Sequence, residues 1–272
     1  MNRHPKSALV ALVAVVSAIA LAACGDSNDN KSSGQGGGAE ITPQSGQKKG
    51  GTLQVQSAEG FEHLDPGSSY FQLDYEVVYA AHRPLYSFKP EDPTRVTPDL
   101  AASEPQISPD EKTVTIKIRP NVKYSPPVNR AATSQDVKFA IERGFNPNVA
   151  NGYAPSYFSD IEGADKAKGG PIAGIQTPDD TTIVFKLTKP FGATMAKALS
   201  LPLSAPVPKE YMDEIKGDAK SPSVYDSDPA KQAFTGPYVI KSYAAGKSVT
   251  LARNPSWIRR PPATTDRPTW TR

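Results

Sequence analysis

A strand followed by a capped helix, within residues 97–144, constrains the fold of this chain more than any other stretch. Apolar and polar residues alternate over Val114–Arg119, which is the period of a strand with one buried face. Thr133 or Ser134 can cap the helix that follows, where apolar residues recur on one helical face up to Gly144. The stretch therefore predicts a strand and a helix that each bury one side.

Other elements continue the pattern on both sides of this unit. Ile175–Lys189 repeats the turn and the alternating strand, and we expect this strand to pair antiparallel with Val114–Arg119. Gly51–Gln56 predicts an opening strand, Asp74–Leu85 a helix, and residues 235–253 two strands joined by a short turn. Together the elements predict a mixed α+β fold of the α/β class.

The composition is that of an ordinary globular protein, with 22% charged and 38% hydrophobic residues. The formal net charge of +3 resides in residues 258–272, which hold four arginines and one aspartate. The rest of the chain is neutral overall, so nothing in its charge indicates a nucleic-acid partner.

Residues 1–24 have the form of a lipoprotein signal peptide. Two basic residues precede an apolar run over Ala8–Ala20, which is too short to span a bilayer comfortably. The run leads into the lipobox-like sequence Leu21–Cys24, and Cys24 is the single cysteine of the chain. We expect Cys24 to be the site of lipid attachment; a plain secretory signal is the alternative. Residues 25–50 are rich in Gly, Ser, Gln and Asn and predict a disordered tether.

The order of residues in the central stretch carries a resemblance. Pro98–Ser103, Ser108–Arg119 and Ala132–Arg143 are similar to the signature of the peptide/nickel-type extracytoplasmic solute-binding proteins, family 5. These are the receptors of oligopeptide and dipeptide ABC importers. Residues 125–130 depart from the pattern, because the family usually has an aromatic-His/Ser-Asp-Gly run there. The matches extend over Gly51–Trp257, about three-quarters of the chain.

The resemblance implies lobe I of a periplasmic-binding-protein-like fold. By this match lobe I spans residues 51–257, with its core at 51–85 and 200–257 and an inserted subdomain at about 86–199. The implied function is an extracytoplasmic receptor that binds peptides, or a related small solute, and delivers them to the permease subunits of an ABC importer. The implied location is the outer face of the cytoplasmic membrane or the periplasm, where a lipid anchor holds the protein to the membrane.

The same resemblance predicts five ligand-binding residues. In oligopeptide-binding relatives a Tyr-Ala-x-Tyr segment presents a tyrosine hydroxyl to the peptide backbone, which makes Tyr153 the first candidate and Tyr157 the second. Tyr70, Phe71 and Gln72 stand where relatives offer backbone groups to an extended peptide. Aromatic side chains on a loop suit a ligand-facing role, although they serve equally well to pin a long loop to the body.

Residues for catalysis or metal binding do not form a recognisable set. The chain has three histidines, and neither His63 nor His82 has a cysteine or carboxylate cluster at ligand spacing. A hydrolase would need a nucleophile with its base, or a metal cluster. We therefore expect no metal, no cofactor and no enzymatic activity.

The character of the chain changes after Trp257. Residues 258–272 have no periodicity and hold three prolines and four arginines. Relatives continue there into a second lobe, so we expect that lobe to be missing and the tail to be aberrant and disordered. A shifted reading frame and a naturally truncated homologue both explain such a tail. The alternative function is therefore a truncated, non-transporting fragment of such a receptor, or an interaction or chaperone-like lipoprotein.

Overall fold

The computed structural model describes residues 50–257. By its internal contacts the chain divides into two units, Met1–Lys49 and Gly50–Arg272, and the described residues all belong to the second unit. Cys24, nearly all of the predicted tether and the tail at residues 258–272 lie outside the described residues. The three predictions made for them stay predictions.

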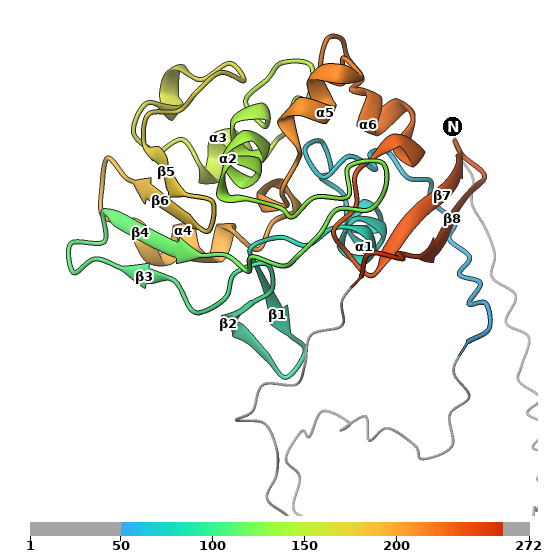
Figure 1. Cartoon of the computed structure of the whole chain (residues 1–272), viewed down its shortest axis with the longest axis horizontal. Helices are drawn as coiled ribbons and strands as arrows, with labels where there is room; N and C mark the ends of the chain where they lie inside the picture. Colours follow the sequence, from blue (N-terminus) through green and yellow to red (C-terminus); the bar gives the residue numbers. More distant parts are fainter. Residues whose placement is uncertain (1–49, 258–272) are drawn as a thin grey trace, which may run out of the picture. The chain divides into compact units, whose positions relative to one another are not determined.

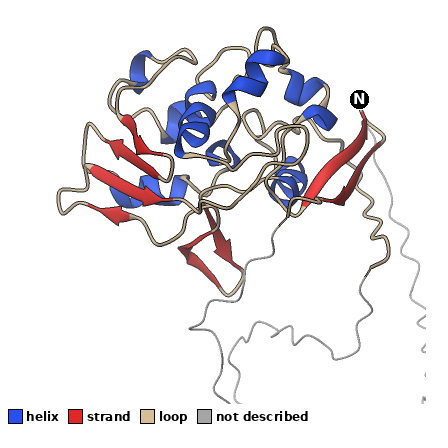
Figure 2. Ribbon diagram, viewed as in Figure 1, coloured by secondary structure: helices blue, strands red, loops and turns tan. Residues whose placement is uncertain are grey.

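Strands and helices follow one another through the described part of the chain (Figures 1 and 2). The strands are β1 Tyr86–Lys89, β2 Asp92–Pro98, β3 Gln106–Ile107, β4 Thr113–Lys117, β5 Ile175–Asp179, β6 Thr182–Lys186, β7 Tyr238–Ala244 and β8 Ser248–Arg253. The α-helices are α1 Gln72–Ala81, α2 Ser134–Arg143, α3 Ala154–Tyr157, α4 Gly192–Ala198, α5 Lys209–Glu214 and α6 Val224–Ser227. Short 3-10 helices lie at Ala164–Lys166, Pro202–Ser204 and Pro229–Lys231. None of the helices within residues 50–257 is long and apolar enough to cross a membrane.

The largest sheet has the strand order β3–β4–β6–β5. Its central strands, β4 and β6, pair antiparallel, with Val114 opposite Phe185 and Ile116 opposite Ile183. All four of these side chains are fully buried, because each strand turns its apolar face to the core. The predicted pairing of the two turn-and-strand repeats is confirmed.

Helix α2 begins where its capping residues predicted. The Asp136 carboxylate accepts the backbone N–H of Thr133 at 2.8 Å, so Thr133 is the N-cap and Asp136 closes the first turn. Val137 and Ile141 are fully buried on the side of the helix that faces the sheet strands β5 and β6. The helix thereby packs its apolar stripe on the sheet, as its sequence spacing indicates.

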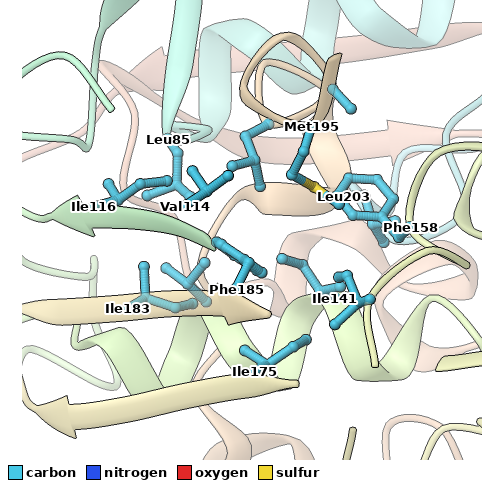
Figure 3. Packing of buried hydrophobic residues seen from close by; sticks show 14 of the residues in the cluster. Leu85, Val114, Ile116, Ile141, Phe158, Ile175, Ile183, Phe185, Met195 and Leu203 are labelled. Atoms are coloured by element: carbon cyan, nitrogen blue, oxygen red, sulfur yellow. The ribbon is translucent and has the colours of Figure 1, made fainter. Parts of the chain in front are cut away.

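The main hydrophobic cluster lies between this sheet and helices α2 and α4 (Figure 3). All of its buried members come from residues 85–203. The residues shown and labelled are Leu85, Val114, Ile116, Ile141, Phe158, Ile175, Ile183, Phe185, Met195 and Leu203. The burial of these side chains is the main force that holds the sheet and its helices together.

A second cluster joins the two ends of the described chain. Leu64, Val77 and Ala81 pack with Phe234 and Ile240, so helix α1 lies against strand β7 of the β7–β8 hairpin. The first cluster therefore draws on residues 85–203, and the second on residues from either side of that range. Two smaller clusters pack Ala140 with Val207 and Tyr225, and Tyr124 with Ala233, so they join both ranges, and the predicted division into a core and an inserted subdomain stays a prediction.

The strand predicted for Gly51–Gln56 is wrong. These residues join no sheet within the described part of the chain, and Leu53 and Val55 are 87% and 73% exposed. Alternation of apolar and polar residues selects the face that a strand would bury, but a strand also needs a neighbouring edge for its backbone hydrogen bonds. The β7–β8 hairpin is a sheet of two strands and does not pair with this segment.

Candidate functional site

A buried turn, Asp65–Ser69, brings the predicted residues Tyr70 and Phe71 to the surface. The carbonyl oxygen of Asp65 accepts the amides three and four residues later, at 3.0 and 2.8 Å. Every residue of the turn is buried, whereas Tyr70 and Phe71 are 44% and 46% exposed. Helix α1 begins directly afterwards at Gln72, which is also exposed.

The loop that follows α2 lies beside this turn and is bonded to it. Ser68 Oγ donates to the carbonyl oxygen of Val149 at 2.9 Å, and Asn151 Nδ2 donates to the carbonyl oxygen of Gly67 at 2.6 Å. Asn151 Oδ1 accepts the amides of Tyr153 and of the next residue, at 2.8 and 2.9 Å. The segment that precedes α1 and the segment that leads into α3 are therefore held together by side-chain hydrogen bonds.

Four aromatic rings meet where these two segments touch, and we call Tyr70, Phe71, Tyr153 and Tyr157 the ring cluster. Tyr70 stacks on Tyr153, with 4.6 Å between ring centroids and 21° between ring planes. Phe71 meets Tyr70 edge to face at 5.3 Å, and Tyr157 meets Tyr153 at 5.7 Å. Four of the five predicted ligand-binding residues thus lie together, and Gln72 follows them on α1. Their role in binding stays a prediction.

Two further tyrosines, which were not predicted as site residues, lie beside the ring cluster. Tyr75 and Tyr79 lie one turn apart on α1, with 5.5 Å between ring centroids, and the Tyr79 hydroxyl donates to the carbonyl oxygen of Ser200 at 2.9 Å. Burial, with a smaller contribution from Tyr153, raises the pKa of Tyr79 to about 12 and also raises the pKa of Tyr75. Both phenols are therefore neutral near pH 7. Aromatic residues at positions i and i+4 of a predicted helix were the signal for them.

A buried network of one cation and two anions fixes the turn that carries Tyr70. Arg143 Nη1 and Nη2 donate to the two carboxylate oxygens of Asp65 at 2.8 and 2.7 Å. Arg143 Nε and Nη2 donate to Asp218 at 2.8 and 2.7 Å. Burial alone would raise the pKa of Asp65, but the charge and hydrogen bonds of Arg143 outweigh burial and hold that pKa below its usual value. Asp65 is therefore a buried, charged partner of Arg143.

The backbone of the turn lies directly on the Arg143 guanidinium. A Cβ atom at Gly67 would lie 2.2 Å from Arg143 Nη1, closer than real Cβ atoms approach, and 3.0 Å from a Val149 methyl group, which is a tight contact. The amide of Gly67 also donates to Asp65 Oδ1 at 2.7 Å. A larger residue at position 67 would therefore displace the Arg143 guanidinium from its pairing with Asp65, so the turn favours glycine there.

The two histidines of this region have separate partners. His63 Nδ1 pairs with Asp226 Oδ2 at 2.7 Å, and His82 Nε2 pairs with Gln232 Oε1 at 2.6 Å. Within residues 50–257 no group of three or more His, Cys, Asp and Glu side chains is arranged to hold a metal ion. Neither histidine belongs to the ring cluster.

Comparison with known families identifies the chain. The family model for bacterial extracellular solute-binding proteins, family 5 (middle), matches residues 95–270. The match covers more than half of the chain, so this protein belongs to that family. The family that the residue order of the central stretch resembles is confirmed, and with it the extracytoplasmic solute-binding class.

Named relatives resemble this chain in sequence over part of their own length. The probable D,D-dipeptide-binding periplasmic protein of Escherichia coli K12 is 24% identical over 208 residues, which are 75% of this chain and 36% of the relative. A putative ABC transporter peptide-binding protein of Brucella ovis is 31% identical over 204 residues, which are 73% of this chain and 33% of the relative. The chain therefore spans about a third of the length of these curated relatives.

Solved structures give the same picture of the fold. Listeria monocytogenes OppA bound to peptide is similar with a TM-score of 0.62 and 25% identity, over 72% of this chain and 37% of that one. The clavulanic acid biosynthesis oligopeptide binding protein 2 is similar with a TM-score of 0.62 and 28% identity, over 73% of this chain and 35% of that one. The mixed α+β fold of a periplasmic-binding-protein lobe is confirmed, and the matched share is consistent with one lobe.

Replacing Arg143 with methionine should lower the free energy of unfolding by about 3–5 kcal/mol, because Asp65 would remain buried without its partner. Urea denaturation of the full chain measures the change. Arg95→Met is the matched control: Arg95 pairs with Glu104 at 3.5 Å, and its side chain is 74% exposed. We expect that control to lose less than about 1 kcal/mol. Equal losses in the two variants would contradict the role assigned to the buried network.

The buried histidine predicts a dependence of stability on pH. Burial lowers the pKa of His82 to about 4, against hydrogen bonding from Gln232 and attraction to Asp65, both of which raise it. Between pH 6.5 and about 4 the unfolded state therefore binds more protons than the folded state. We expect His82 to make the protein less stable as the pH falls through this window, and to add no further loss below it.

Urea denaturation across the same pH window tests this expectation. The His82→Gln variant should lose the part of the pH dependence that belongs to this residue. The comparison variant is His63→Gln, because the side chain of His63 is 38% exposed and its partner Asp226 is 8% exposed, whereas His82 is 2% exposed. A pH dependence unchanged in His82→Gln would show that His82 is not its source.

Proposed function

We propose that this chain is the solute-binding part of an extracytoplasmic receptor, which binds peptides and delivers them to the permease of an ABC importer. The observation that carries the proposal is the ring cluster, in which a chain of family 5 brings together four of the five residues that the family resemblance predicts for peptide contact. Relatives are named as peptide-binding proteins of ABC transporters, and one structural neighbour is bound to peptide. A related small solute is the alternative ligand.

In this proposal Tyr153 and its neighbours act on the peptide in two ways. The Tyr153 hydroxyl forms a hydrogen bond with a peptide backbone amide, and the rings of Tyr70, Phe71 and Tyr157 supply contact area at little cost in side-chain entropy. The backbone of Tyr70–Gln72 pairs with the extended main chain of the ligand. Because pairing of this kind reads main chain rather than side chains, the receptor tolerates many peptide sequences.

The ring cluster forms one wall of the proposed site. A two-lobed receptor encloses its ligand when the lobes close about a hinge. This chain spans about a third of the length of its curated relatives, and a ligand on a single wall keeps much of its surface in water. Binding assays that test this wall by itself therefore need high peptide concentrations.

The remaining parts of the proposal concern the anchor, catalysis and nucleic acid. Cys24 becomes the lipid-modified residue, and residues 25–50 tether the folded part to the outer face of the cytoplasmic membrane.

The protein acts by binding and not by catalysis, as family 5 members are solute-binding proteins. Residues 1–257 carry no net charge to attract nucleic acid, since the +3 of the chain lies in residues 258–272.

Titration calorimetry of the full chain with trialanine and with the nonapeptide RPPGFSPFR tests peptide binding. The Tyr153→Phe variant keeps the ring but removes the hydroxyl, so we expect its affinity to fall by about twofold to tenfold, the value of one hydrogen bond. Tyr238→Phe is the matched control, because Tyr238 lies on β7 outside the ring cluster and contacts Arg253. That control should bind as the wild type does.

Two outcomes would count against these roles. If the wild-type chain binds neither peptide at millimolar concentration, the receptor proposal fails for this chain, and the non-transporting alternative gains support. If the chain binds peptide and Tyr153→Phe binds equally well, the hydroxyl of Tyr153 has no part in recognition.

The lipid anchor is tested separately in bacterial cells that express the full chain. Wild-type protein should incorporate labelled palmitate and sediment with the membranes, because the lipobox-like Leu21–Cys24 ends in the thiol that would be modified. Cys24→Ser should lose the label and leave the membrane fraction, whereas the neighbouring Ser27→Ala should keep both. Equal labelling of the Cys24→Ser variant would rule out this anchor.

A further inference from the structure

The stack of Tyr70 on Tyr153 is not fixed by regular secondary structure. Tyr70 lies two residues before the start of α1, and Tyr153 lies directly before α3, a helix of four residues. We propose that Asn151 and Gly152 are the positioning residues of the ring cluster. Their effect on ligand binding rests on the proposed function, but their effect on the two rings does not.

Asn151 connects both segments through one side chain. Its Nδ2 donates to the carbonyl oxygen of Gly67 at 2.6 Å, in the turn that leads to Tyr70. Its Oδ1 accepts the amides of Tyr153 and Ala154 at 2.8 and 2.9 Å, in the segment that carries the second ring. The residue is only 5% exposed, so water does not replace these bonds easily. Only a side-chain amide of this length offers both a donor and a double acceptor here.

Gly152 makes room for the ring that Asn151 brings into place. A Cβ atom at position 152 would lie 2.7 Å from Tyr70 Cε2 and 2.9 Å from Tyr70 Cδ2. The Tyr70 ring therefore packs against the bare backbone of residue 152, and this contact continues directly into its stack on Tyr153. Any larger residue at 152 pushes the Tyr70 ring away from that place.

A second tie keeps the two segments adjacent when the first is altered. Ser68 Oγ donates to the carbonyl oxygen of Val149 at 2.9 Å, independently of Asn151. Changes at positions 151 and 152 should therefore displace the rings without separating the segments. This makes variants of both residues suitable for a binding experiment on folded protein.

Two variants disturb the stack from opposite sides. Asn151→Asp keeps the acceptor for the amides of Tyr153 and Ala154 but loses the donor to Gly67. Gly152→Ala keeps all three hydrogen bonds of Asn151 and inserts a methyl group against the Tyr70 ring. The matched control is Asn148→Ala in the same loop, because Asn148 Nδ2 donates to the carbonyl oxygen of Asp218 at 2.9 Å, away from the turn that leads to Tyr70.

Three measurements on the full chain are compared for these variants. Ring-to-ring nuclear Overhauser effects between Tyr70 and Tyr153 report the stack, calorimetry with trialanine and RPPGFSPFR reports affinity, and thermal denaturation reports stability. We expect Asn151→Asp and Gly152→Ala to lose the Overhauser effect and to bind about threefold to tenfold more weakly, an effect of the size of one hydrogen bond. Asn148→Ala should keep the Overhauser effect and the wild-type affinity, even if it is less stable.

The outcomes separate the inference from the proposed function. If both variants keep the Overhauser effect, Asn151 and Gly152 do not position the rings, and the inference is overturned. If the effect is lost while affinity stays that of the wild type, the rings are not part of the ligand site and the inference about binding is overturned. If the wild type binds neither peptide, the proposed function fails, and the Overhauser effects alone decide whether these residues position the rings.

Discussion

The bidentate pairing of Arg143 with Asp65 is the interaction on which the arrangement of the candidate site depends. The Arg143 side chain is 1% exposed and that of Asp65 is 0% exposed, so both charges are shielded from water and are paired with each other. Such a pair adds little net stability over a well-packed apolar pair, but the loss of one partner is costly. The pair instead fixes the position of the turn that leads to Tyr70. Asp65 begins this buried turn, the backbone of Gly67 lies on the guanidinium, and Tyr70 follows at the surface.

Helix α2 connects this network to the rest of the fold. Its apolar side, with Val137 and Ile141, belongs to the main hydrophobic cluster, and Arg143 is its last residue. A cation in the last turn also suits the negative end of the helix dipole. The loop that carries Tyr153 leaves the helix directly after Arg143. The same short helix therefore sets the place of the sheet, the buried turn and the ring-bearing loop.

Periodicity predicted the elements better than it predicted the site. The alternation around Val114 and the cap at Thr133 foretold β4 and α2, because both signals are local in the sequence. The prediction of an opening strand at Gly51–Gln56 was wrong, because strand pairing depends on the edge of a neighbouring strand, which the residues of the segment itself do not reveal. Arg143 and Asn151 were missed for a related reason: each bonds to residues remote in the sequence, and hydrophobic patterns do not register buried polar groups. Tyr70 and Tyr153 were named through family resemblance, and no local pattern indicated that their rings would touch.

The exposed opening segment has a consequence for how the protein behaves in solution. Leu53 and Val55 point apolar side chains into water along an extended stretch whose backbone groups join no sheet in the described part of the chain. Apolar side chains exposed on a segment without backbone pairing can associate with another molecule. Solubility is therefore a property that this segment affects, and charged residues at positions 53 and 55 are the simplest way to raise it.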